Sequence, residues 1–72
     1  MNLEYQITVH TARADRVFNL INPITSLELE VWQDGKDTVI DIFYTFGFFE
    51  TEVDEILYLL EDNHYLFTLK DV

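Results

Sequence analysis

Alternation of apolar and polar side chains limits the folds open to this chain more than any other feature of its sequence. In residues 3–9, apolar side chains occupy every second position, and residues 27–33 and 38–46 follow the same period. A period of two puts the apolar side chains on one face, so each segment is predicted to be a half-buried strand. Residues 65–70 are predicted to form a last strand.

Two other segments have the spacing of amphipathic helices. Residues 11–22 are predicted to form a helix that Thr11 caps and Pro23 ends. Residues 51–62 are predicted to form a second helix with Thr51 as its N-cap. The predicted buried stripes are Val17, Phe18, Leu20 and Ile21 in the first helix, and Val53, Ile56, Leu57 and Leu60 in the second.

The order of these elements is β-α-β-β-α-β, which is the order of the split βαβ or ferredoxin-like sandwich. The sequence therefore predicts one small α+β domain over residues 1–72, with both helices on one face of the sheet. If the first helix does not form, the expected fold is a three- to four-stranded antiparallel sheet with one helix.

Asp34-Gly35 predicts a hairpin between the second and third strands, because both residue types tolerate the positive φ of a type I′ turn. The sequence leaves the loop length open. A two-residue loop pairs Glu28 with Asp41, whereas a four-residue loop pairs Glu30 with Asp41. Either register places two carboxylates directly opposite each other, which destabilises a sheet. We therefore interpret the pair as a feature that serves binding.

Acidic residues outnumber basic ones by fourteen to four, which gives the chain a net charge of −10. Residues 37–72 carry nine carboxylates against Lys70 alone. This charge opposes compaction, and it would repel both nucleic acid and anionic membrane surfaces. The chain is not a disordered acidic tail, since 49% of its residues are hydrophobic and 15% aromatic. The expected partner is a protein with a basic surface.

Acidic and aromatic side chains on the strands and at the second helix form the candidate partner-binding site. Trp32 and Phe43 share a sheet face with the strand carboxylates and can act as apolar anchors. The predicted binding residues are Glu28, Glu30, Trp32, Asp37, Asp41, Phe43, Glu50, Glu52, Asp54, Glu55, Glu61 and Asp62.

Small size, absence of cysteine, strong acidity and carboxylates at these strand and helix positions together resemble the class of phage-encoded DNA-mimic and host-takeover proteins. Such proteins present carboxylates in place of phosphates and occupy the DNA site of a host protein. The resemblance implies an inhibitor of a basic host DNA-binding protein, such as a histone-like nucleoid protein or a defence nuclease. It also implies a monomer or dimer in the cytoplasm of the host cell.

Two other functional classes stay open. One is a small acidic homodimer with a structural or regulatory role, or an antitoxin-like partner of a basic protein. The other is a small-ligand regulatory domain of ACT type, which ranks last because no glycine lies between Val9 and Arg13.

No catalytic, metal or cofactor site is predicted. The chain has no cysteine, a single serine and no glycine-rich phosphate loop, and the acids in residues 50–55 lack the spacing of an EF-hand. His10 and His64 are expected at the same end of the sheet. The N-terminus lacks the features of a signal peptide, and no apolar run is long enough to cross a membrane.

Overall fold

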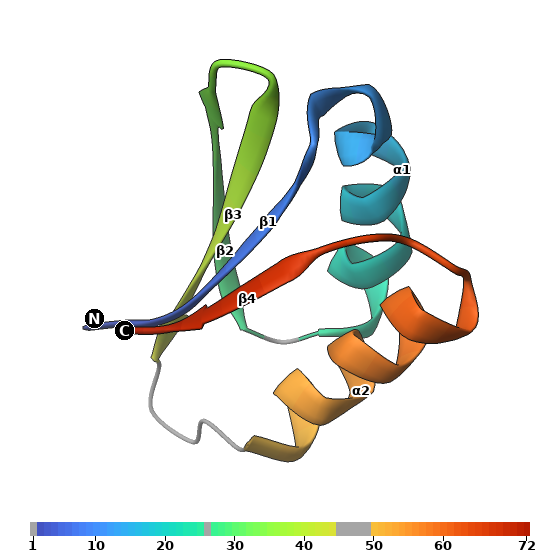
Figure 1. Cartoon of the computed structure of the whole chain (residues 1–72). Coiled ribbons are helices and arrows are strands. Elements are labelled where there is room, and N and C mark those ends of the chain that lie inside the picture. Colours follow the sequence, from blue (N-terminus) through green and yellow to red (C-terminus); the bar gives the residue numbers. More distant parts are fainter. Residues whose placement is uncertain (1, 26, 45–49) are drawn as a thin grey trace.

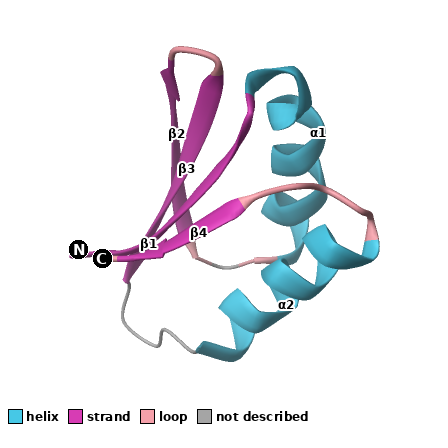
Figure 2. Cartoon of the chain, in the orientation of Figure 1, coloured by secondary structure: helices cyan, strands magenta, loops and turns pink. Residues whose placement is uncertain are grey.

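The computed structural model describes residues 2–25, 27–44 and 50–72, and it has an α+β fold (Figure 1). The elements are β1 (Asn2–His10), α1 (Thr11–Ile21), the 3₁₀ helix η1 (Asn22–Ile24), β2 (Glu28–Asp34), β3 (Asp37–Tyr44), α2 (Glu50–Asp62) and β4 (Thr68–Asp71). The four strands form one antiparallel sheet in the order β2-β3-β1-β4, and both helices lie on the same side of it (Figure 2). The α+β prediction is confirmed, and the one-helix alternative is wrong because α1 is present.

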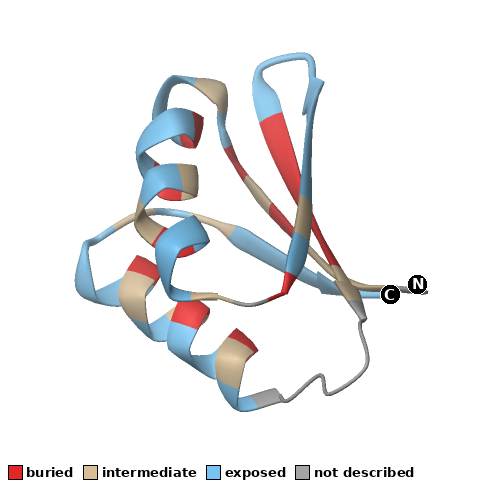
Figure 3. Cartoon of the chain, turned by 180° about the vertical axis from the view of Figure 1, so that it is seen from behind, coloured by how far each residue is buried: buried red, intermediate tan, exposed pale blue. Residues whose placement is uncertain are grey.

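The core lies between the sheet and the two helices (Figure 3). Ile7 and Ile40 pair across β1 and β3 and are fully buried, as is Ile42 next to them. Full burial of a side chain of this size stabilises a fold by about 1.5–3 kcal/mol. The helices contribute Ala14, Val17 and Ile21 from α1, and Val53, Ile56 and Leu60 from α2.

The predicted helical stripes are therefore largely confirmed. Phe18, Leu20 and Leu57 are only half-buried, because they lie at the margins of their stripes. Ala14, which the predicted stripe of α1 omitted, is buried because it lies one turn before Phe18 and three residues before Val17. The helix ends before Pro23, as predicted.

The hairpin has the register predicted for the longer loop. Glu30 pairs with Asp41, and the ladder continues to a last pair between Asp34 and Asp37. The turn residues are consequently Gly35 and Lys36, not Asp34-Gly35. Within the turn φ is positive at Gly35 (63°) and not at Lys36, which is the pattern of a type II′ turn and corrects the predicted type I′.

Both predicted N-caps are wrong. The N-cap of α1 is His10, whose Nδ1 accepts a hydrogen bond from the backbone N–H of Ala12 at 3.1 Å. The Thr11 hydroxyl instead forms a 3.0 Å hydrogen bond with the hydroxyl of Thr38 on β3, so a contact across the fold takes the side chain away from capping. Helix α2 begins one residue before Thr51, which lies inside its first turn.

Two strand predictions also need correction. A register shift between Leu3 and Tyr5 breaks the alternation of β1, and it pairs Leu3 with Phe43 on the opposite face from Tyr5. The last strand begins at Thr68 instead of residue 65. The predicted end of the third strand, residues 45–46, lies outside the described residues.

Candidate partner-binding surfaces

The predicted binding residues fall on two opposite sides of the sheet. The open face, on the side of the sheet opposite α1 and α2, carries one set on the hairpin: Glu28, Glu30, Trp32, Asp37, Asp41 and Phe43. Helix α2, in the layer on the other side, carries the second set: Glu50, Glu52, Asp54, Glu55, Glu61 and Asp62. The side chain of Glu50 lies outside the description. Because the sheet separates the two sets, a flat partner surface can contact only one of them at a time.

Unlike the exposed Glu28, Glu30 and Asp37 on the same face, Asp41 is buried. Only 8% of its surface is accessible, and both of its oxygens accept hydrogen bonds. Gln6 Nε2 donates to Oδ1 and Trp32 Nε1 donates to Oδ2, each at 2.8 Å. A buried carboxylate is tolerated where such donors satisfy it. Asp41 therefore positions Trp32 and is not itself presented to a partner.

Apolar side chains flank Asp41 on the open face. Val39 is 6% exposed although it lies on this face, where Trp32 of β2 is its partner across the hairpin. Phe43 is half-buried two residues beyond Asp41. Glu28 and Glu30 are exposed beside these residues. The open face thus combines the indole of Trp32, which Asp41 orients, with the carboxylates of Glu28 and Glu30 on alternate residues of the edge strand β2.

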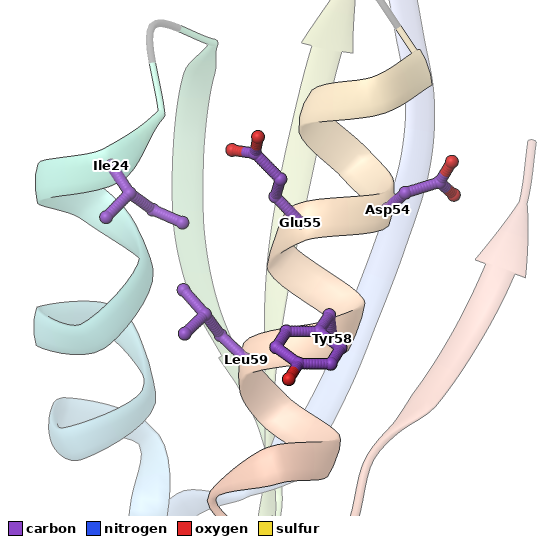
Figure 4. Close-up of a pocket in the computed structure, with 5 residues that line it drawn as sticks. All are labelled: Ile24, Asp54, Glu55, Tyr58 and Leu59. Carbon is purple, nitrogen blue, oxygen red and sulfur yellow. The ribbon is translucent and has the colours of Figure 1, made fainter.

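The second surface is an apolar groove of about 430 Å³ between η1 and α2 (Figure 4). Ile24 extends toward α2, and Leu59 and Glu55 point back toward it, whereas Asp54 projects from the other side of the helix. Tyr58 completes the lining and is 67% exposed. The walls of the groove are hydrocarbon, and its rim carries carboxylates.

The sequence reasoning identified the acids of this groove but missed its apolar residues. Tyr58 and Leu59 lie outside the buried stripe of α2. A large apolar residue on the polar side of a helix cannot pack into the core of its own domain. Their positions in the sequence could therefore have indicated a binding surface. Ile24 gave no comparable signal because it follows Pro23 in a short connection.

His10 and His64 line one pocket, together with Arg13, which confirms that the two histidines lie at the same end of the sheet. Among the described residues, no three or more histidine, aspartate or glutamate side chains are grouped in a way that could hold a metal ion. None of the described helices has the length and the apolar character that crossing a bilayer requires. The chain matches no protein-family model, and neither a curated protein nor a solved structure is significantly similar to it.

Proposed function

We propose that this chain is a noncatalytic binding domain whose α2 surface holds a basic, amphipathic segment of a partner protein. The observation that carries the proposal is the groove between η1 and α2, in which exposed Tyr58 stands beside Ile24 and Leu59. Apolar grooves of this kind accept the apolar face of a helix. Exposed tyrosines are also among the residues that most often dominate the energy of an interface.

Carboxylates around the groove determine the charge of the partner segment that can bind there. Asp54 and Glu55 line the groove, and Glu61 and Asp62 are exposed further along the same helix. A segment whose apolar residues enter the groove would therefore place lysine or arginine against these carboxylates. The net charge of −10 would accelerate encounter with such a segment and reject acidic ones.

The test is an NMR titration of the labelled protein with a peptide of about 18 residues, roughly five helical turns, with leucine at helical spacing and lysine elsewhere. A scrambled peptide of the same composition is the control ligand. Tyr58→Ala should weaken binding at least tenfold, because it removes the exposed anchor of the groove. Leu66→Ala is the matched control, since Leu66 is 92% exposed and lies outside the groove. Equal affinities of the two variants, or of the two peptides, would overturn the proposal.

A second candidate is DNA mimicry by the open face, and one observation favours it. Glu28 and Glu30 are exposed on the same face of the edge strand β2, about 6.6 Å apart along the chain. Such a row can stand in for phosphates on the DNA site of a basic host protein. Under mimicry, that protein is captured from bacterial lysate at low salt and released by duplex DNA. Glu28→Gln with Glu30→Gln would abolish capture, whereas Tyr58→Ala would not.

We also assign the fold to the ferredoxin-like type. The support is the sheet order β2-β3-β1-β4, in which β3 lies between β1 and β2, the two strands that α1 connects.

Homodimerisation through the open face stays a prediction, and sedimentation of wild type against Trp32→Ala tests it.

A further inference from the structure

We propose that the pocket between the start of α1 and the end of α2 binds a small organic anion, namely a phosphate monoester or carboxylate that bears a compact apolar group. His10, Arg13, His64, Tyr65 and Leu66 line this pocket, whose volume is about 320 Å³. It shares no lining residue with the groove between η1 and α2, so this inference does not depend on the proposed function.

Positive and hydrogen-bond-donating groups are concentrated at this pocket. The chain has only four lysine and arginine residues and two histidines, against fourteen acids. Three of these six residues, His10, Arg13 and His64, line the one pocket although they come from distant parts of the sequence. Arginine presents several N–H donors in a fixed plane that matches phosphate and carboxylate oxygens.

The imidazole of His10 uses only one of its two ring nitrogens for the helix cap. Its Nδ1 accepts a hydrogen bond from the Ala12 backbone N–H, so in the neutral imidazole the proton is on Nε2. The cap therefore leaves Nε2–H as a donor. The positive end of the α1 dipole lies at the same place and favours an anion further.

His64 has an uncommon backbone conformation. This residue has φ of 60°, which is the left-handed conformation that glycine or asparagine normally supplies at the end of a helix. A non-glycine residue there costs about 1–2 kcal/mol, and such costs concentrate at functional sites. A glycine at this position would end the helix without backbone strain but would add no side chain to the pocket. His64 ends the helix and also places an imidazole at the pocket.

The remaining lining residues define the other part of the ligand. Tyr65 is half-buried, and Leu66 is 92% exposed. An apolar group attached to the anion would contact both side chains. The nearest acids in sequence or register are Asp15 after Arg13, Asp37 opposite His10 and Asp62 before His64. All three are exposed and do not line the pocket.

The test is an NMR titration of the full chain with phenyl phosphate at constant ionic strength, with phenol as the neutral control ligand. Arg13→Gln should weaken phenyl phosphate binding at least fivefold, which is the loss expected when a charged donor is removed. The matched control is Arg16→Gln, because Arg16 is exposed on the same helix and lies outside the pocket. The affinity of Arg16→Gln for phenyl phosphate should stay within about twofold of that of the wild type.

Saturable shifts confined to the pocket residues, with loss in Arg13→Gln only, support the proposal. Three results would each overturn it: equal affinity of the two arginine variants, binding of phenol as tight as that of phenyl phosphate, or shifts spread equally over Lys36 and Lys70. The spectra of both variants report whether they are folded.

Discussion

At the scale of single residues, Asp41 explains how a chain with this many acids tolerates a carboxylate within its sheet. Its cross-strand partner, Glu30, is exposed, whereas Asp41 is 8% exposed and accepts hydrogen bonds from Gln6 and Trp32. Two N–H donors satisfy both oxygens of the buried carboxylate, so the unfavourable carboxylate pair is partly offset. From the sequence, the pair of Glu30 and Asp41 is interpreted as a feature that serves binding. In the structure, Asp41 has a structural role and only Glu30 is exposed to a partner.

Replacing Asp41 by Asn should destabilise the fold by about 1–3 kcal/mol, because the amide cannot accept from both donors and leaves one of them unsatisfied. Glu30→Gln is the matched control, since it removes the same charge from the exposed partner and should change stability by less than about 0.5 kcal/mol. Urea denaturation followed by circular dichroism measures both, and the fluorescence of Trp32 reports on its lost contact. If the two variants were equally stable, the hydrogen bonds to Asp41 would have no structural weight.

At the scale of elements, the sequence predicted what local periodicity determines. Most strand faces and buried helical stripes follow from spacing, whereas spacing left the hairpin register open between Glu28 and Glu30 as the partner of Asp41. Helix caps did not follow, because they depend on contacts between distant residues. Thr11 is a preferred cap residue, yet Thr38 takes its hydroxyl, and His10 caps α1 instead. No local pattern encodes that exchange.

The end of α2 gives the prediction at this scale. The N–H of Tyr65 donates to the carbonyl of Leu60 at 2.9 Å and that of His64 to Glu61 at 3.0 Å, which is a Schellman motif with His64 in the left-handed position. His64→Gly should stabilise the fold by about 1 kcal/mol relative to His64→Ala, because both remove the imidazole and only glycine relieves the backbone. Thermal denaturation of the two variants checks it, and a lower melting temperature for the glycine variant would contradict it. Both should bind phenyl phosphate more weakly than wild type.

At the scale of the whole molecule, composition gave the number of carboxylates but not their arrangement. The fold separates the hairpin acids from those of α2 by the thickness of the sheet, and it buries Asp41 of the hairpin. The groove arises where Ile24 meets Tyr58 and Leu59, residues more than thirty positions away. Periodicity assigns a residue to a face of its own element, whereas a site depends on which faces the fold brings together.

The net charge of −10 opposes folding of the chain and favours binding of a basic partner. Raising NaCl from about 0.01 M to about 0.15 M shortens the screening length from about 30 Å to about 8 Å. Weaker self-repulsion should stabilise the fold by about 1 kcal/mol, or about 4–8 °C in melting temperature for a domain of this size. The variant that combines Glu61→Gln with Asp62→Asn removes two exposed charges and should show a smaller rise. Affinity for the basic peptide should fall over the same salt range. A melting temperature that falls with salt would mean that attractive charge pairs, and not repulsion, dominate the surface.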